Sequence, residues 1–137
     1  MIKLLRVDHR LLHGQVVYSW CSQIKPNCIL VANDEVVENE IRKAALRLAK
    51  PNETKLVFKN INDSVTAINE GKTDKYDLMI VVNNIEDAVK LAEQCPQVSS
   101  INLGGTKANE LTHAISNMVN VTTEEELLLK KIVAQGI

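Results

Sequence analysis

The sequence predicts a single α/β domain over residues 1–137, built on a doubly wound, mostly parallel β-sheet with helices on both faces. Short apolar segments alternate with longer segments in which apolar residues recur at helical spacing. The short segments are almost continuously hydrophobic, which is typical of parallel strands covered on both faces. A chain of 137 residues can bury one such core, and no linker or repeat divides it.

The expected strands are the short apolar segments. The segment 77–83 is the most hydrophobic of them, so we expect it to lie near the centre of the sheet. The segment 98–105 ends in two glycines. In chain order, the expected strands span residues 2–7, 28–33, 55–59, 77–83, 98–105 and 117–121.

The expected helices span residues 14–24, 35–50, 61–71, 85–95 and 124–136. For the helix over 35–50, Asp34 is the expected N-cap and Pro51 ends the pattern. Thr122 or Thr123 caps the last helix, whose first turn carries three glutamates that complement the helix dipole. The apolar residues of the 35–50 helix recur at the spacing of one helical face: Val37, Ile41, Ala44, Ala45 and Leu48.

Composition narrows the possible functions. The formal net charge is −1, without the basic excess that nucleic-acid-binding domains show, so we expect no nucleic-acid partner. No apolar run reaches the roughly 20 residues that span a bilayer, and the N-terminus does not have the pattern of a signal peptide. The three cysteines have no CxxC spacing and are expected to be buried or partly buried thiols. These features predict a cytoplasmic protein.

Polar or glycine-rich residues follow four of the expected strands. Ligands of doubly wound sheets bind beyond the carboxyl ends of the strands, which makes this edge the expected functional edge. We expect one shallow crevice there. It would be lined by Asp8, Arg10, His13, Asn83 and residues 102–106.

The stretch VDHRLLHGQ, residues 7–15, places titratable side chains where the first strand ends and the first helix is expected to begin. A helix start presents unpaired N–H groups that favour an anion, and Gly14 allows close approach of a bound group. A neutral imidazole such as that of His13 keeps one ring nitrogen free as a nucleophile. Arg10 can bind phosphate oxygens with its planar fork, and Asp8 can orient Arg10 or His13. This combination suits the acceptance and transfer of a phosphoryl group.

Other interpretations of these motifs stay open at this point. His9 and His13 have the i, i+4 spacing of two metal ligands, but no glutamate follows His9 and Arg10 lies between them. The NLGG segment, residues 102–105, is either a tight turn or a ligand loop. His113 has no charged neighbour in sequence, so we expect it to be structural.

The stretch LLRVDHRLLHGQVVYSW resembles the opening of the IIB subunits of the mannose/fructose/sorbose family of the bacterial sugar phosphotransferase system. That family begins with a strand, then R-[IV]-D-x-R-[LI]-[IL]-H-G-Q-V, then a helix with a tryptophan. The resemblance continues in ILVANDEVVENEIRKAAL, in VVNNIEDAVKL and in INLGGT, the N-x-GG element of the family. The opening motif is matched by Arg6, Asp8, Arg10, Leu11, Leu12, His13, Gly14, Gln15, Val16 and Trp20.

The resemblance implies a phosphocarrier. A phosphohistidine of a IIA subunit or domain would supply the phosphoryl group, and a sugar brought by the membrane subunits IIC and IID would receive it. His13 takes the position of the phosphorylated histidine and Arg10 that of the phosphate-stabilising arginine, with Asp8 as a third catalytic residue. No cofactor or metal is implied, and the protein would associate peripherally with the membrane subunits. Phosphate binding is assigned to Gly14, Gln15, Gly104 and Gly105.

One departure from the family concerns the end of the chain. Family members continue past ARGI with a further strand, whereas this chain stops at AQGI. We therefore expect a domain that lacks this C-terminal strand, either as a short member or as an incomplete chain. Neither the sugar nor the oligomeric state is predicted.

Two alternative functions remain at the level of sequence. One is a small α/β phosphate- or nucleotide-binding regulatory module without covalent phosphotransfer. The other is a metal-dependent hydrolase that uses Asp8, His9 and His13.

Overall fold

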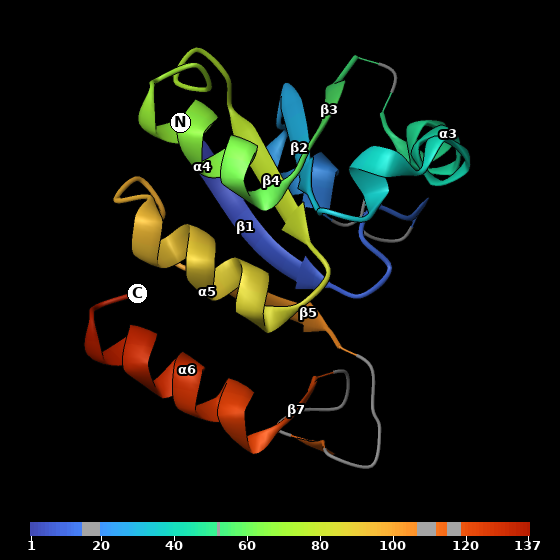
Figure 1. Ribbon diagram of the computed structural model, residues 1–137. Helices are drawn as coiled ribbons and strands as arrows, with labels where there is room; N and C mark the ends of the chain where they lie inside the picture. Colours follow the sequence, from blue (N-terminus) through green and yellow to red (C-terminus); the bar gives the residue numbers. More distant parts are fainter. Residues whose placement is uncertain (15–19, 52, 107–111, 115–118) are drawn as a thin grey trace.

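The computed structural model describes residues 1–14, 20–51, 53–106, 112–114 and 119–137 (Figure 1). Strands and helices alternate along most of the chain, as the hydrophobic pattern predicts. The elements are β1 (Ile2–Asp8), α2 (Ser22–Ile24), β2 (Cys28–Ala32), the 3₁₀ turn η2 (Val36–Glu38), α3 (Glu40–Ala49), β3 (Lys55–Lys59), α4 (Ile61–Asn69), β4 (Leu78–Val82), α5 (Ile85–Gln94), β5 (Asn102–Gly105), β6 (His113–Ala114), β7 (Asn120–Val121) and α6 (Thr123–Ala134).

The main sheet has five strands in the order β3-β2-β4-β1-β5, and all of its pairings are parallel. β4 is the middle strand, which confirms the position predicted from its hydrophobicity. From β1 the chain moves toward β2 and β3, whereas from β4 it moves to β5 on the other side of β1. The topological switch point therefore lies between the ends of β1 and β4. β6 and β7 form a separate antiparallel pair.

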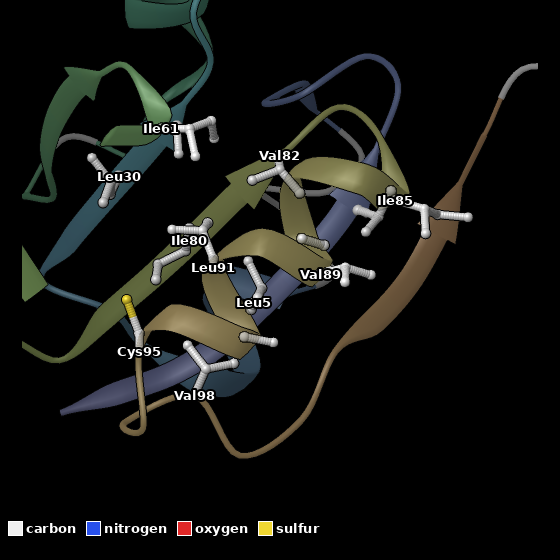
Figure 2. Close-up of a cluster of buried hydrophobic side chains, with 14 of the residues drawn as sticks. Leu5, Leu30, Ile61, Ile80, Val82, Ile85, Val89, Leu91, Cys95 and Val98 are labelled. Atoms are coloured by element: carbon white, nitrogen blue, oxygen red, sulfur yellow. The ribbon is translucent and has the colours of Figure 1, made fainter. Parts of the chain in front are cut away.

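The sheet has a hydrophobic cluster on each face because successive strand side chains point to opposite sides. On β4, Ile80 belongs to the cluster covered by α4, α5 and α6, whereas Met79 and Val81 belong to the cluster covered by α3. Figure 2 shows strand residues such as Leu5 and Ile80 beneath the α5 side chains. Helices on both faces confirm the doubly wound fold.

Asparagine side chains cap three of the helices. Asn39, Asn60 and Asn84 accept the first-turn N–H groups of α3, α4 and α5. Thr122 caps α6 and forms a capping box with Glu125, which confirms one of the two predicted caps.

The prediction of Asp34 as the cap of α3 is wrong. The Asn33 side chain accepts the N–H groups of Glu35 and Val36 and stabilises η2, so α3 begins only at Glu40. Asp34 instead accepts the N–H of Ile61, at the start of α4, over 2.8 Å.

α3 is oriented differently from the pattern typical of a surface helix. Leu46 is its buried residue, whereas Ile41 is 86% and Leu48 is 89% exposed. The opposite side of the helix lies against β3, where Lys43 and Arg47 pack over the Phe58 ring. The apolar face predicted from helical spacing is therefore directed to solvent.

Several strands and helices are shorter than the sequence predicts. The strand expected over 98–105 spans Asn102–Gly105, and the one expected over 117–121 contains Asn120–Val121, with 117–118 outside the described residues. Of the helix expected over 14–24, Gly14 is helical and α2 closes the segment, while 15–19 lie outside the described residues.

The cysteines are buried free thiols, as predicted: Cys21, Cys28 and Cys95. Within the described part of the chain, no helix combines the length and the apolar character needed to cross a membrane.

Candidate functional site

The carboxyl end of β1 turns sharply at Asp8. The Asp8 carbonyl accepts the N–H of Leu11 over 2.8 Å, and the Asp8 carboxylate accepts the N–H of Arg10 over 3.0 Å. Leu11 has a φ of 59°, a left-handed conformation that non-glycine residues rarely adopt. Its side chain is fully buried, so packing holds this conformation in place. The turn thus brings Arg10 and His13 back toward Asp8.

Asp8, Arg10 and His13 come together at this turn, as the sequence predicts. His13 Nε2 lies 3.1 Å from Asp8 Oδ2, and Arg10 Nε lies 3.7 Å from Asp8 Oδ1. The Asp8 side chain is 1% exposed, that of His13 18% and that of Arg10 45%. A buried carboxylate therefore holds two partners that solvent and a ligand can reach.

The Asp8 carboxylate stays ionised in this setting. Burial raises the pKa of Asp8. Hydrogen bonds from the Arg10 N–H and from His13, together with the charges of His13 and Arg6, outweigh that effect, so the pKa lies below its ordinary value. An ionised carboxylate can only accept a hydrogen bond, so the ring proton of His13 is placed on Nε2. Nδ1 is then the ring nitrogen with the free lone pair.

Arg6 is a second guanidinium at the site, to which sequence reasoning assigned no role. Its Nη1 donates to Asn102 Oδ1 over 2.6 Å, its Nη2 lies 3.5 Å from Asp8 Oδ2, and its Cζ lies 5.3 Å from the centroid of the Trp20 ring. Burial lowers the pKa of Arg6, and the Asp8 charge opposes this shift. The signal was available, since residues two apart on a strand share a face and Arg6 lies two positions before Asp8.

Gly104 makes room for Arg6. A Cβ atom at position 104 would overlap the Arg6 guanidinium, so only glycine lets this side chain lie across β5. Gly105 pairs with Asp8 across the sheet, and its carbonyl accepts the N–H of His9 over 3.0 Å. NLGG is thus an edge strand of the site rather than a tight turn. Phosphate binding by Gly104 and Gly105 stays a prediction.

The remaining predicted phosphate ligands lie on the helix side of the turn. Gly14 is exposed, and none of the residues that the structure describes lies within 4 Å of a Cβ built on it. Gln15 lies outside the described residues.

The predicted single crevice is divided in two. His9, Asn83 and Thr106 are among the residues that line a polar depression of about 330 Å³ at the switch point. Arg10 instead lines a second depression, of about 480 Å³, on the side of α3. The two depressions are adjacent, because Arg42 of α3 lines both of them.

His113 also has Nε2 against a carboxylate, but at an exposed position rather than beside a buried one. The Nε2 atom of His113 lies 2.7 Å from Oε2 of Glu126, a partner that the sequence pattern did not suggest. Among the residues that the structure describes, no group of three or more histidine, cysteine or acidic side chains could hold a metal ion.

The fold and the site together define a class: a small doubly wound α/β protein with a histidine–carboxylate–arginine cluster at the carboxyl end of its sheet. Residues 2–137 match the family described as the sorbose-subfamily IIB component of the phosphotransferase system (PTS). The chain belongs to this family, which confirms the resemblance of the opening motif.

Individual relatives agree with this assignment. A probable phosphotransferase enzyme IIB component from Streptococcus pyogenes is 35% identical over 103 residues, which cover 75% of this chain and 63% of the relative. The mannose-specific EIIAB component of the PTS from Escherichia coli is 30% identical over 138 aligned positions, which cover 100% of this chain and 42% of the relative. The chain thus spans less than two thirds of the length of these relatives.

A solved structure shows the same fold. The IIBSor domain of the sorbose permease from Klebsiella pneumoniae superimposes with a TM-score of 0.91 at 24% identity, and the match covers 99% of this chain and 83% of that domain.

Proposed function

We propose that this IIB chain is a phosphocarrier that accepts a phosphoryl group on His13 from a phosphorylated IIA protein and passes it to a sugar held by the membrane subunits IIC and IID. The observation that carries the proposal is the 3.1 Å contact between His13 Nε2 and the buried Asp8 carboxylate. It leaves Nδ1 as the nucleophile of the ring. The family and the names of its relatives support the same reaction class.

In the first step, Nδ1 of His13 attacks the phosphorus atom of the IIA phosphohistidine. A new N–P bond forms, the donor N–P bond breaks, and its electron pair returns to the donor imidazole. Because Nε2 keeps its proton, the phosphorylated ring carries a positive charge. The ionised Asp8 carboxylate offsets that charge and keeps the ring oriented.

In the second step, a sugar hydroxyl oxygen attacks the phosphorus atom and loses its proton to solvent. The N–P bond breaks, and its electron pair returns to Nδ1, which regenerates the neutral imidazole with its proton on Nε2. The positively charged phospho-ring is a better leaving group than a neutral one, so the same Asp8–His13 contact serves both steps.

The arginines supply the positive charge for the phosphoryl oxygens. A phosphorylated side chain brings roughly −1.5 to −2 charges, and the half-exposed Arg10 can swing toward them. Arg6 is held by Asn102 and Trp20, so it acts as a fixed charge behind Asp8. The N–H groups of Gly14 and Gln15 at the predicted helix start are the further phosphate contacts in this proposal.

The proposed location follows from the partners. IIA delivers the phosphoryl group in the cytoplasm, and the sugar emerges on the cytoplasmic side of IIC and IID. The chain would therefore work in the cytoplasm in peripheral contact with these membrane subunits.

The test is transfer of radioactive phosphate from phosphoenolpyruvate through the general PTS proteins and IIA to this chain. We expect the wild type to take up label that is labile in acid and stable in alkali, as for a phosphoramidate. His13→Ala should abolish labelling because it removes the only proposed acceptor. His9→Ala and His113→Ala are the matched controls and should keep it.

Label that survives in His13→Ala, or that resists acid like a phosphoserine, would contradict the proposal. An unlabelled wild type that binds inorganic phosphate or a nucleotide would favour the regulatory module instead.

A further inference from the structure

α3 carries an apolar face without a partner in the described part of the chain. Ile41 and Leu48 are 86% and 89% exposed, and Ala44 and Ala45 between them are also exposed. Positions seven apart lie within roughly 20° of each other around a helix, so these residues form one stripe. We call Ile41, Ala44, Ala45 and Leu48 the α3 face.

Among the described helices, α6 also has exposed large apolar side chains, but they do not form such a stripe. On α6, Leu127 is 61% and Val133 is 69% exposed. Positions six apart lie roughly 120° from each other around the helix axis, so these two side chains are scattered. Single exposed apolar residues are ordinary, whereas an aligned stripe indicates a binding surface.

The α3 face continues into the proposed phosphoryl site. A depression of about 480 Å³ is lined by Ile41 and Ala45 from α3 and by Arg10 and Leu12 from the turn after β1. A protein that reaches the Arg10 side of the turn therefore meets the α3 face at the same time.

Two cations border this surface. Arg10 and Arg42 line the depression, beside Ile41 and Ala45. An apolar stripe with a basic border fits a partner surface that is apolar at its centre and acidic or phosphorylated at its edge.

We infer that the α3 face, together with Arg10 and Arg42, is the docking surface for the phosphorylated IIA donor; this inference rests on the proposed function. The donor arrives with the phosphoryl charge on its own histidine, so the basic border attracts it. After transfer, the phosphoryl group and its negative charge are on His13. There the charge neutralises part of the positive charge of Arg10 and Arg42, so the dephosphorylated donor is attracted less strongly. The sugar-bearing subunits bring no such charge, which is why we assign the surface to the donor.

The size of the surface suits a carrier. Two large and two small apolar side chains provide less surface area than a permanent interface buries. Transient complexes use small surfaces of this kind. A partner that must leave after every transfer needs this limited affinity.

The test compares two double variants with equal added charge. Ile41→Glu/Leu48→Glu alters the α3 face, and Leu127→Glu/Val133→Glu alters the exposed residues of α6 as the control. Label transfer from phosphorylated IIA is measured over a range of IIA concentrations. We expect the α3 variant to raise the KM for IIA by about tenfold or more, as loss of a central interface contact does, and the control to leave it unchanged. Maximal transfer at saturating IIA should be retained in both.

Other outcomes would overturn the inference. An unchanged KM in the α3 variant means that IIA docks elsewhere. If the wild type sediments as a dimer that the α3 variant abolishes while its KM for IIA is normal, the surface joins two copies of this chain. If only sugar phosphorylation by vesicles with IIC and IID falls, the surface belongs to the membrane subunits.

The inference can also fail separately from the proposed function. If the wild type takes no label at all, the phosphocarrier role fails. Binding of IIA to the wild type and to the two double variants, measured by sedimentation, then tests the α3 face directly. Equal binding by all three chains would end the docking inference.

Discussion

α3 and α5 are both ten-residue helices with an asparagine N-cap, but they bury very different amounts of apolar surface. α5 packs its apolar face against the centre of the sheet, where it buries Ile85, Ala88, Val89, Leu91 and Ala92. α3 buries Leu46 alone and leaves Ile41 and Leu48 in solvent. Figure 1 shows α5 between the sheet and α6, whereas α3 lies on the far side of the sheet from α6.

The comparison shows that the apolar spacing of a helix does not by itself predict whether its apolar face is buried or which element covers it. Both sequences place apolar residues three, four and seven positions apart, and both form helices. α5 follows the middle strand and crosses toward β5, so its apolar face has the sheet beneath it. α3 follows η2 and lies beside the turn after β1, where its cations find the Phe58 ring and its apolar face adjoins the site.

The largest expected effect is the difference in stability between substitutions on the buried face of α5 and on the exposed face of α3. Leu91→Ala on α5 removes a fully buried side chain and should lower the free energy of unfolding by about 2–5 kcal/mol through lost transfer energy and a cavity. Leu48→Ala on α3 should change it by less than about 0.5 kcal/mol. Urea unfolding of both variants measures the difference. A large loss in Leu48→Ala would mean that the α3 face is buried in solution.

The next largest effect is expected at the Asp8 carboxylate at the end of β1. Asp8→Asn removes the carboxylate that Arg6, Arg10 and His13 share, and should destabilise the fold by about 2–3 kcal/mol at pH 7. The pKa of Asp8 is lower in the folded chain than its ordinary value, so its contribution is fully present above about pH 4 and is lost as the pH falls through the folded pKa.

The stability difference between wild type and Asp8→Asn should therefore narrow below about pH 4. Urea unfolding across a pH series measures it. A difference that stays constant down to pH 2 would show that Asp8 contributes through packing rather than charge.

The smallest expected effect is a difference in stability between alanine substitutions at two glycines of the site. Gly104→Ala should displace Arg6 and cost about 1–3 kcal/mol by overpacking, because its Cβ would overlap the guanidinium. Gly14→Ala meets open space and should change the free energy of unfolding by less than about 0.5 kcal/mol. Thermal or urea unfolding compares the pair. Equal stability of the two variants would show that Arg6 is not held over Gly104.

The sequence by itself determined most of the strands and helices and the chemistry of the turn after β1. Continuous apolar runs such as LMIVV are typical of strands buried on both faces, so the order and hydrophobicity of the segments predicted parallel strands and a central β4. Asp8, Arg10 and His13 are neighbours in the chain, and a turn after a strand keeps neighbours together whatever else the fold does. The VDHRLLHGQ motif also pointed to the family, because its spacing is long and specific.

Only the tertiary structure decided the arrangements that join distant segments. Arg6 meets Asn102 and the bare backbone of Gly104 because β1 pairs with β5, a pairing between residues almost a hundred positions apart. The sequence pointed to Asp34 as the cap of α3, but Asn33 stabilises η2, Asp34 bonds to the start of α4, and Asn39 caps a helix that begins only at Glu40. The orientation of α3 likewise depended on Phe58 of a strand formed later in the chain. Local patterns define which side chains can interact, but long-range packing chooses among them, because each choice depends on the free energy of the whole fold.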